Sequence, residues 1–198
     1  MIDLTPQATL VSELILGISD DRLGDPTPCE AMPVRLLVAH ILGLAVAFRD
    51  AAQKIDGPTT STPPDPAGLA LPDDWREQIP LRLTELADAW DNQAAWQGTT
   101  QAGGLTMPAG DAGLVALDEL VLHGWDLAVA TSRPYAVEPA ALDAVEQFVS
   151  AVPDDPDARA GLFGPVVAVD ADASRLDRVL GLAGRDPRWT ASRSRRAT

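Results

Sequence analysis

The stretch that decides the fold reads Val34-Arg-Leu-Leu-Val-Ala-His40-Ile-Leu-Gly-Leu-Ala-Val-Ala-Phe48, an apolar run with one histidine near its centre. The run is interrupted by His40 and is too short to span a bilayer. Pro33 precedes it and can occupy the first turn of a helix, where a missing N–H group costs nothing. We therefore predict a helix over residues 33 to about 54, with His40 in its interior.

A second stretch, Asp118-Glu119-Leu-Val-Leu-His123-Gly-Trp-Asp126, carries the other histidine of a chain that has only two. Glu119 and His123 are four residues apart, so on a helix they share one face about one turn apart. Asp126 continues that face three residues later. His40, Glu119 and His123 therefore form a candidate metal site of two imidazoles and one carboxylate, which leaves metal positions open for chemistry.

Other interpretations of these residues stay open at the level of sequence. A single histidine on an apolar helix face is more often a packed core residue than a ligand. A Glu/His pair at this spacing can simply stabilise an exposed helix, and His40 can hydrogen-bond to Glu119 without any metal. However, burying Glu119 among leucines costs on the order of several kcal/mol unless a cation or hydrogen bonds offset that cost.

Asp126 and Cys29 each allow more than one role. Asp126 can act as a fourth ligand or orient His123, which is a common arrangement around metal-bound imidazoles. It can also face a substrate as an acid–base group, or be a solvated residue on the helix surface. Cys29 lies just before the second helix and is interpreted as a small buried hydrophobe rather than a reactive thiol.

The remaining pattern predicts an all-α fold. Apolar residues at helical spacing predict three more long helices, at residues 6–20, 73–96 and 109–134. Four long helices in one domain are typical of a four-helix bundle. Residues 57–66 are predicted to be a proline-rich loop incompatible with a helix. Residues 99–108 are predicted to be an extended or hairpin-like connection.

The last third of the chain has shorter predicted elements. They are a helix at residues 139–150, an extended segment at 163–169 and a short capped helix at 172–182. We accordingly predict a metal-binding four-helix bundle over residues 1–134, a small C-terminal extension packed on it over residues 135–190, and a flexible tail over residues 191–198.

Composition excludes several classes of function. The formal net charge is −14 and no basic stripe accompanies it, so nucleic acid and anionic membrane surfaces are not expected partners. The single cysteine cannot form an internal disulfide. The N-terminus lacks the features of a signal peptide, and the chain has no phosphate-binding glycine motif. The sequence predicts a cytoplasmic protein without a nucleotide cofactor.

Several motifs together carry a family resemblance. In the bundle they are Thr27-Pro-Cys29, Val34-Arg-x-Leu-x-x-His40-Ile-x-Gly43 and Asp118-Glu119-x-x-x-His123-Gly-Trp-Asp126-Leu-Ala. In the last third they are Phe163-Gly-Pro165, Asp172-Ala-Ser174 and Asp177-Arg-x-Leu-x-Leu-x-Gly-Arg-Asp-Pro187 with Trp189. The chain resembles the mycothiol-dependent maleylpyruvate isomerase metal-binding domain family, within the wider DinB/YfiT-like superfamily, and its ending is similar to a subgroup of that superfamily. The resemblance covers nearly the whole chain.

The resemblance implies an up-down-down-up four-helix bundle with a divalent metal ion near one end. Zinc is the metal expected first, with nickel and iron as alternatives. The implied ligands are His40, Glu119 and His123, and the implied residue of the active site is Asp126. Mycothiol, a low-molecular-weight thiol, is the implied cosubstrate.

The sequence also departs from the family pattern. Ala31-Met32-Pro33 stands where Gly-Trp-Thr is usual, and Leu36 stands where an acidic residue is usual. The family's isomerase carries a larger C-terminal domain with an arginine that binds thiol or substrate, and that domain does not align with this chain. By its chemistry, Arg185 is the candidate here for binding an anionic group of the cofactor.

The function expected first is thiol activation on a metal ion, because the cation favours the thiolate form. A protein with this function is a transferase or a cis-trans isomerase, and its partners are a small-molecule thiol and an electrophile. The alternative is a non-catalytic, stress-related bundle that binds a metal or ligand, and a third interpretation is a metal-free interaction protein. Dimerisation through bundle faces is common in such folds, so a homodimer is also expected.

Overall fold

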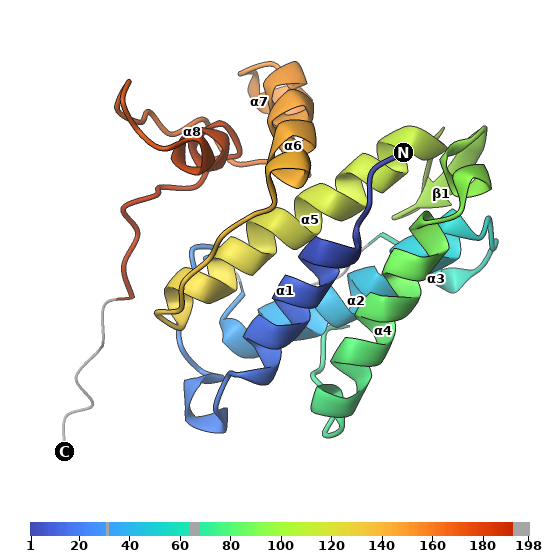
Figure 1. The fold of residues 1–198 in the computed structure, drawn as a ribbon, viewed down its shortest axis with the longest axis horizontal. Coiled ribbons are helices and arrows are strands. Elements are labelled where there is room, and N and C mark those ends of the chain that lie inside the picture. The colour runs from blue at the N-terminus through green and yellow to red at the C-terminus, as the bar shows by residue number, and fades with distance from the viewer. Residues whose placement is uncertain (31, 64–67, 192–198) are drawn as a thin grey trace.

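Four long helices form the body of the protein, which a computed structural model describes over residues 1–30, 32–63 and 68–191. They are α1 (Thr5–Leu16), α2 (Val34–Ala52), α4 (Trp75–Trp90) and α5 (Ala109–Ala130). Helices α1 and α5 run in one direction and α2 and α4 run in the opposite one (Figure 1). The predicted all-α, up-down-down-up bundle of DinB-like type is confirmed.

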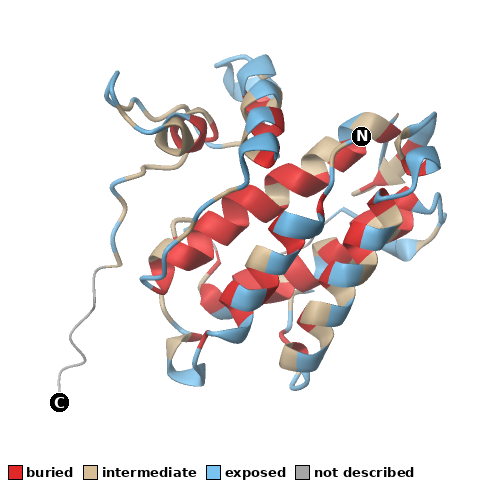
Figure 2. Cartoon of the chain, in the orientation of Figure 1, coloured by how far each residue is buried: buried red, intermediate tan, exposed pale blue. Residues whose placement is uncertain are grey.

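Helix α5 is the most deeply buried of the four (Figure 2). Helices α1 and α2 each pack against both α4 and α5, so α5 contacts neighbours on two sides. Its side chains Leu117, Val121 and Leu127 are fully buried. A helix that is apolar on nearly all sides is stable only inside a protein, and this composition explains its central place.

The region after α4 corrects one prediction. The expected helix over residues 73–96 ends at Trp90, and a separate 3₁₀ helix, η3 (Gln93–Trp96), follows. The side chain of Asn92 accepts a hydrogen bond from the Ala94 backbone N–H at 3.0 Å. Asparagine side chains compete with the helical backbone for such bonds, which explains the break at this point.

A hairpin follows η3, and one helical turn lies in the connection between α2 and α4. The hairpin expected at residues 99–108 is confirmed as β1 (Thr99–Ala102) paired antiparallel with β2 (Leu105–Pro108). Gly103 and Gly104 join the strands, and both have positive φ, as a tight two-residue hairpin turn requires. The loop predicted at residues 57–66 is wrong in part, because α3 (Pro58–Ser61) forms one helical turn there. Pro58 fits its first turn, and the Thr60 hydroxyl accepts a hydrogen bond from the Gly57 N–H. Residues 64–66 of the predicted loop lie outside the described residues.

The C-terminal part lies on α5 through α6 (Pro139–Ala151), and α8 (Arg175–Leu182) in turn packs on α6. Ser174 caps α8 by accepting a hydrogen bond from the Asp177 N–H. Two short elements were not predicted, η1 (Asp20–Arg22) and α7 (Pro156–Arg159). Residues 163–169 form neither helix nor strand. Of the predicted tail only Ala191 lies within the described residues, and the division of the chain near residue 134 stays a prediction.

Candidate metal centre

The three predicted ligands meet where α2 packs against α5. Glu119 Oε2 lies 3.0 Å from His123 Nε2 and 3.6 Å from His40 Nε2. The two imidazole rings are edge to face, with centroids 5.0 Å apart. One ligand atom from each residue falls within 4.8 Å of the others. Helix periodicity placed Glu119 and His123 correctly on one face, and the packing of α2 brings His40 opposite them.

Asp126 fixes the orientation of His123 from behind the ring. Its Oδ2 lies 2.9 Å from His123 Nδ1, and the side chain is fully buried. A carboxylate at this distance favours the tautomer in which Nδ1–H donates the hydrogen bond. The lone pair of Nε2 then faces Glu119 Oε2, which has no hydrogen-bond partner among the described residues. Two acceptors at 3.0 Å repel each other unless a cation lies between them.

The electrostatics of the metal-free protein supply a proton as that cation. Burial lowers the pKa of His123, but hydrogen bonding to Asp126 and Glu119 outweighs burial and raises that pKa to about 9. Burial also raises the pKa of Glu119, and His123 and His40 outweigh it, so the net shift is downward. The centre therefore stabilises positive charge between Glu119 and His123.

Arg185 reaches the same centre from the C-terminal extension. One of its Nη atoms lies 3.3 Å from Asp126 Oδ2, and the other donates to the Ala183 carbonyl at 3.0 Å. The preceding residue, Gly184, has φ +79°, and a Cβ there would lie 2.8 Å from the Gly164 backbone. Only glycine fits this position without strain. The chain thus turns tightly after α8 and directs Arg185 inward.

Arg159 holds the same part of the extension together. It is 3% exposed, and its Nε donates to the Gly164 carbonyl at 2.8 Å. A second donor of the same guanidinium binds the Leu182 carbonyl. This buried cation therefore links the loop after α7 to the end of α8, close to Gly184.

A cavity of about 370 Å³ opens onto the centre. It is lined by Pro28, Cys29, Met32, His40, Asp118, Glu119, Leu122, His123, Gly161, Leu162, Gly164, Gly184 and Arg185. Asp126 is not among these lining residues, so its place behind His123 fits the orienting role better than direct contact with a substrate. Cys29 is half-buried at the cavity, and burial raises the pKa of its thiol.

Sequence reasoning missed Asp118. Its side chain lines the cavity and is 5% exposed, and its Oδ1 has no hydrogen-bond partner among the described residues. Burial raises the pKa of Asp118 well above its ordinary value. The available signal was its position next to Glu119. On a helix, Asp118 and Leu122 form the stripe that neighbours the stripe of Glu119 and His123.

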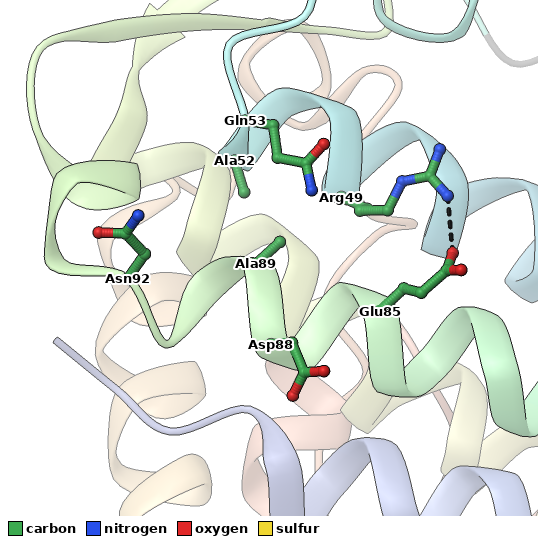
Figure 3. Close-up of a pocket in the computed structure, with 7 residues that line it drawn as sticks. All are labelled: Arg49, Ala52, Gln53, Glu85, Asp88, Ala89 and Asn92. Atoms are coloured by element: carbon green, nitrogen blue, oxygen red, sulfur yellow. Dashed lines mark hydrogen bonds and ion pairs between the residues drawn. The ribbon is translucent and has the colours of Figure 1, made fainter.

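A larger cavity, of about 550 Å³, lies between α2 and α4 (Figure 3). Arg49 from α2 and Glu85 from α4 face each other across it, with 2.7 Å between Nη1 and Oε2. Arg49 also binds Asp50, and Arg82 also binds Glu85. Arg49 and Glu85 are therefore paired across this cavity, Asp88 is the exposed carboxylate of its lining, and neither histidine lines it.

Comparisons with known proteins show a matching family and solved structures of similar fold. The sequence model of the family described as "Mycothiol maleylpyruvate isomerase N-terminal domain" matches residues 4–128. No curated protein matches the chain. The fold is similar to a crystal structure of the mycothiol-dependent maleylpyruvate isomerase, with 20% identity and a TM-score of 0.53. It is also similar to the structure of a histidine-to-alanine mutant of that isomerase, with 18% identity and a TM-score of 0.56. Each comparison covers 75% of this chain and 70% of the other.

Within the described residues, no helix is both long and apolar enough to cross a bilayer.

Proposed function

The chain belongs to the mycothiol maleylpyruvate isomerase N-terminal domain family, and we propose that it holds a divalent metal ion on His40, Glu119 and His123. We propose further that this centre activates a low-molecular-weight thiol, mycothiol, toward an electrophilic substrate. The reaction is then transfer of the thiol to the electrophile or cis-trans isomerisation of the electrophile.

One observation carries the proposal, namely that His40, Glu119 and His123 each bring one potential ligand atom within 4.8 Å of the other two. Glu119 Oε2 faces His123 Nε2 at 3.0 Å and His40 Nε2 at 3.6 Å. Ligand atoms at about 2.1 Å from a tetrahedral zinc ion lie about 3.4 Å from one another. The two distances lie on either side of that value. The metal-free alternative, a simple His40–Glu119 hydrogen bond, is less well supported because 3.6 Å is long for such a bond.

The donor set fits a borderline cation with open coordination positions. Two imidazoles and one carboxylate suit zinc first, and the same ligands accommodate nickel or iron. A bound divalent cation supplies the positive charge that keeps a nearby thiol in its reactive thiolate form at neutral pH.

The surrounding residues have distinct tasks in this proposal. Asp126 holds the His123 ring with Nε2 directed at Glu119, as carboxylates behind ligand imidazoles do. Arg185 lines the cavity with donors that its Asp126 and Ala183 contacts do not use, and it binds an anionic group of the thiol or electrophile. Met32 and Leu162 give the cavity an apolar rim.

Metal stoichiometry of the purified protein tests the ligand set. We expect one equivalent of zinc by elemental analysis after dialysis, and loss of that zinc in Glu119→Gln and in His123→Ala. Glu85→Gln is the matched control, since Glu85 is a partly exposed glutamate on α4 that pairs with Arg49 of α2 and Arg82 of its own helix. Unchanged stoichiometry in Glu119→Gln and His123→Ala would overturn the proposal.

A second experiment separates the thiol-activating protein from the non-catalytic alternative. Cobalt is substituted for the native metal, and mycothiol is titrated while the visible spectrum is recorded. A thiol-dependent sulfur-to-cobalt absorption supports an open, reactive position, after which electrophiles including maleylpyruvate are screened for turnover. A spectrum that does not respond to thiol identifies a saturated structural site, and the non-catalytic, stress-related bundle then replaces the first proposal.

Three further predictions accompany the proposal. They are the division into a bundle of residues 1–134 with an extension of residues 135–190, a homodimer, and a cytoplasmic location. Light scattering of the purified protein measures the oligomeric state directly.

A further inference from the structure

The cavity at the metal centre is lined by a buried carboxylate, Asp118, that the proposed metal site does not use. Asp118 is 5% exposed, lines the cavity and leaves its Oδ1 without a hydrogen-bond partner among the described residues. Buried polar atoms are paired in nearly all native proteins, so each exception calls for a partner. Oδ1 itself is enclosed, but Asp118 lines the cavity, so a molecule that enters the cavity can supply a donor to this carboxylate.

The cations near Asp118 are already engaged. Arg185 acts on it only through longer-range attraction, because its guanidinium bonds to Asp126 and to the Ala183 carbonyl. His123 directs its two ring nitrogens at Asp126 and Glu119. The described residues around Asp118 therefore offer it charge but give its Oδ1 no donor within hydrogen-bond distance.

The position of Asp118 relates it to whatever reaches the metal centre. Asp118 and Leu122 form one stripe of α5, and Glu119 and His123 form the next. Both stripes line the same cavity. A ligand whose reactive atom lies beside Glu119 and His123 therefore places its following atoms within reach of Asp118.

We propose that Asp118 is the polar anchor of a ligand subsite beside the metal centre, where it accepts a hydrogen bond from an O–H or N–H group of the bound thiol. The inference rests on the proposed function and adds a specificity-determining residue to it. The preferred thiols then carry a hydrogen-bond donor a few atoms from sulfur, and thiols with a purely hydrocarbon chain bind less well.

Matched pairs of thiols test this preference in the cobalt-loaded protein. The pairs are 2-mercaptoethanol with 1-propanethiol and 3-mercapto-1-propanol with 1-butanethiol, which differ by a hydroxyl in place of a methyl group. The spectral titration gives Kd for each, and the ratio of the two Kd values in a pair measures the preference for the donor. We expect Asp118→Leu to reduce that ratio about tenfold in at least one pair, which is the effect of one buried hydrogen bond.

Asp88→Leu is the control, because Asp88 is an exposed carboxylate on α4 among the residues that line the other cavity. It should leave both ratios unchanged. Asp118→Ala is the second variant if the leucine variant does not take up cobalt, and Asp118→Asn, which keeps an acceptor oxygen, should restore part of the preference.

The two ways of failing are distinguishable. If all four thiols shift the wild-type cobalt spectrum but the ratios are the same in the Asp118 variants, the subsite is overturned while the proposed function stands. Asp118 then binds a buried water molecule only. If no thiol shifts the wild-type spectrum, the proposed function fails and the subsite fails with it.

Discussion

Two polar clusters on α2 differ in whether their polar groups have hydrogen-bond partners. Toward the end of the helix, Arg49, Asp50 and Glu85 satisfy one another, with Thr59 donating to Asp50 at 2.7 Å. In its middle, His40 meets Glu119 on α5, where a buried carboxylate oxygen has no hydrogen-bond partner among the described residues. The paired cluster borders the larger cavity and the unpaired one borders the smaller. Unmet hydrogen-bonding capacity, rather than the volume of a cavity, therefore indicates where a ligand belongs.

The largest expected effect is a pH dependence that only the unpaired cluster shows. The pKa of His123 is raised to about 9 in the folded protein from its ordinary value of 6.5. Its contribution to stability is therefore fully present below pH 6.5 and is lost as the pH rises through 9. We expect the free energy of unfolding of chelator-treated protein to fall by about 3 kcal/mol over that interval.

Urea unfolding at a series of pH values measures this dependence. The His123→Gln variant should lose most of the slope, whereas Glu85→Gln should keep it. Metal-loaded protein should show the opposite trend, because the ion replaces the proton and needs a neutral imidazole. A chelator-treated protein equally stable at pH 6.5 and pH 9 contradicts the prediction.

A second test compares the two buried aspartates of the clusters. Asp126→Asn removes the carboxylate behind His123, and we expect metal affinity to fall about 10- to 100-fold, as for other outer partners of ligand imidazoles. Asp50→Asn removes a carboxylate that is also buried, from the paired cluster, and should lower the melting temperature without changing metal affinity. Competition with a chromophoric chelator measures both affinities, and equal losses in the two variants would erase the distinction.

A third, smaller effect concerns how the extension reaches the unpaired cluster. Gly184→Ala puts a Cβ 2.8 Å from the Gly164 backbone at a positive φ, and we expect it to cost about 1–3 kcal/mol. Because Arg185 follows directly, thiol affinity should fall in the cobalt-loaded variant while cobalt affinity stays the same. Gly24→Ala, with open space around its Cβ position, is the control. A loss of cobalt affinity in Gly184→Ala would mean that the extension supports the ligands themselves.

The smallest effect is expected from the paired cluster. Glu85→Gln removes partners from Arg49 and Arg82 at a partly exposed position, so it should cost at most about 1 kcal/mol. Thermal denaturation at low and high salt measures this cost, which should shrink as salt rises. A cost that salt does not change would show that these charges are less exposed than the structure indicates.

Helix periodicity predicted the bundle and the shared face of Glu119 and His123, because both depend on local spacing. Glu119 and His123 share a face at any i,i+4 separation, and the apolar run around His40 requires a buried helix. The break at Asn92 and the helical turn at Pro58 were missed because single side-chain hydrogen bonds decide them.

Helix periodicity and local spacing do not predict contacts between distant parts of the chain. Arg185 and Asp126 are 59 residues apart, and nothing local to either residue indicates that they meet. The role of Asp126 stayed open for the same reason, since only the packed structure places it behind the imidazole. The orphan oxygen of Asp118 is likewise a property of its neighbours and not of its position in the sequence.

Because the contact of Arg185 with Asp126 joins the C-terminal extension to the bundle, the two parts can diversify separately around one cavity. The proposed ligands come from two helices of the bundle, whereas one wall of the cavity comes from the segment that Arg159 and Gly184 hold in shape. Selection acting on that segment can remodel the entrance, and with it the choice of substrate, while the reactive end stays intact. An engineer who wants a new specificity should therefore randomise residues 160–164 and leave the four bundle helices alone.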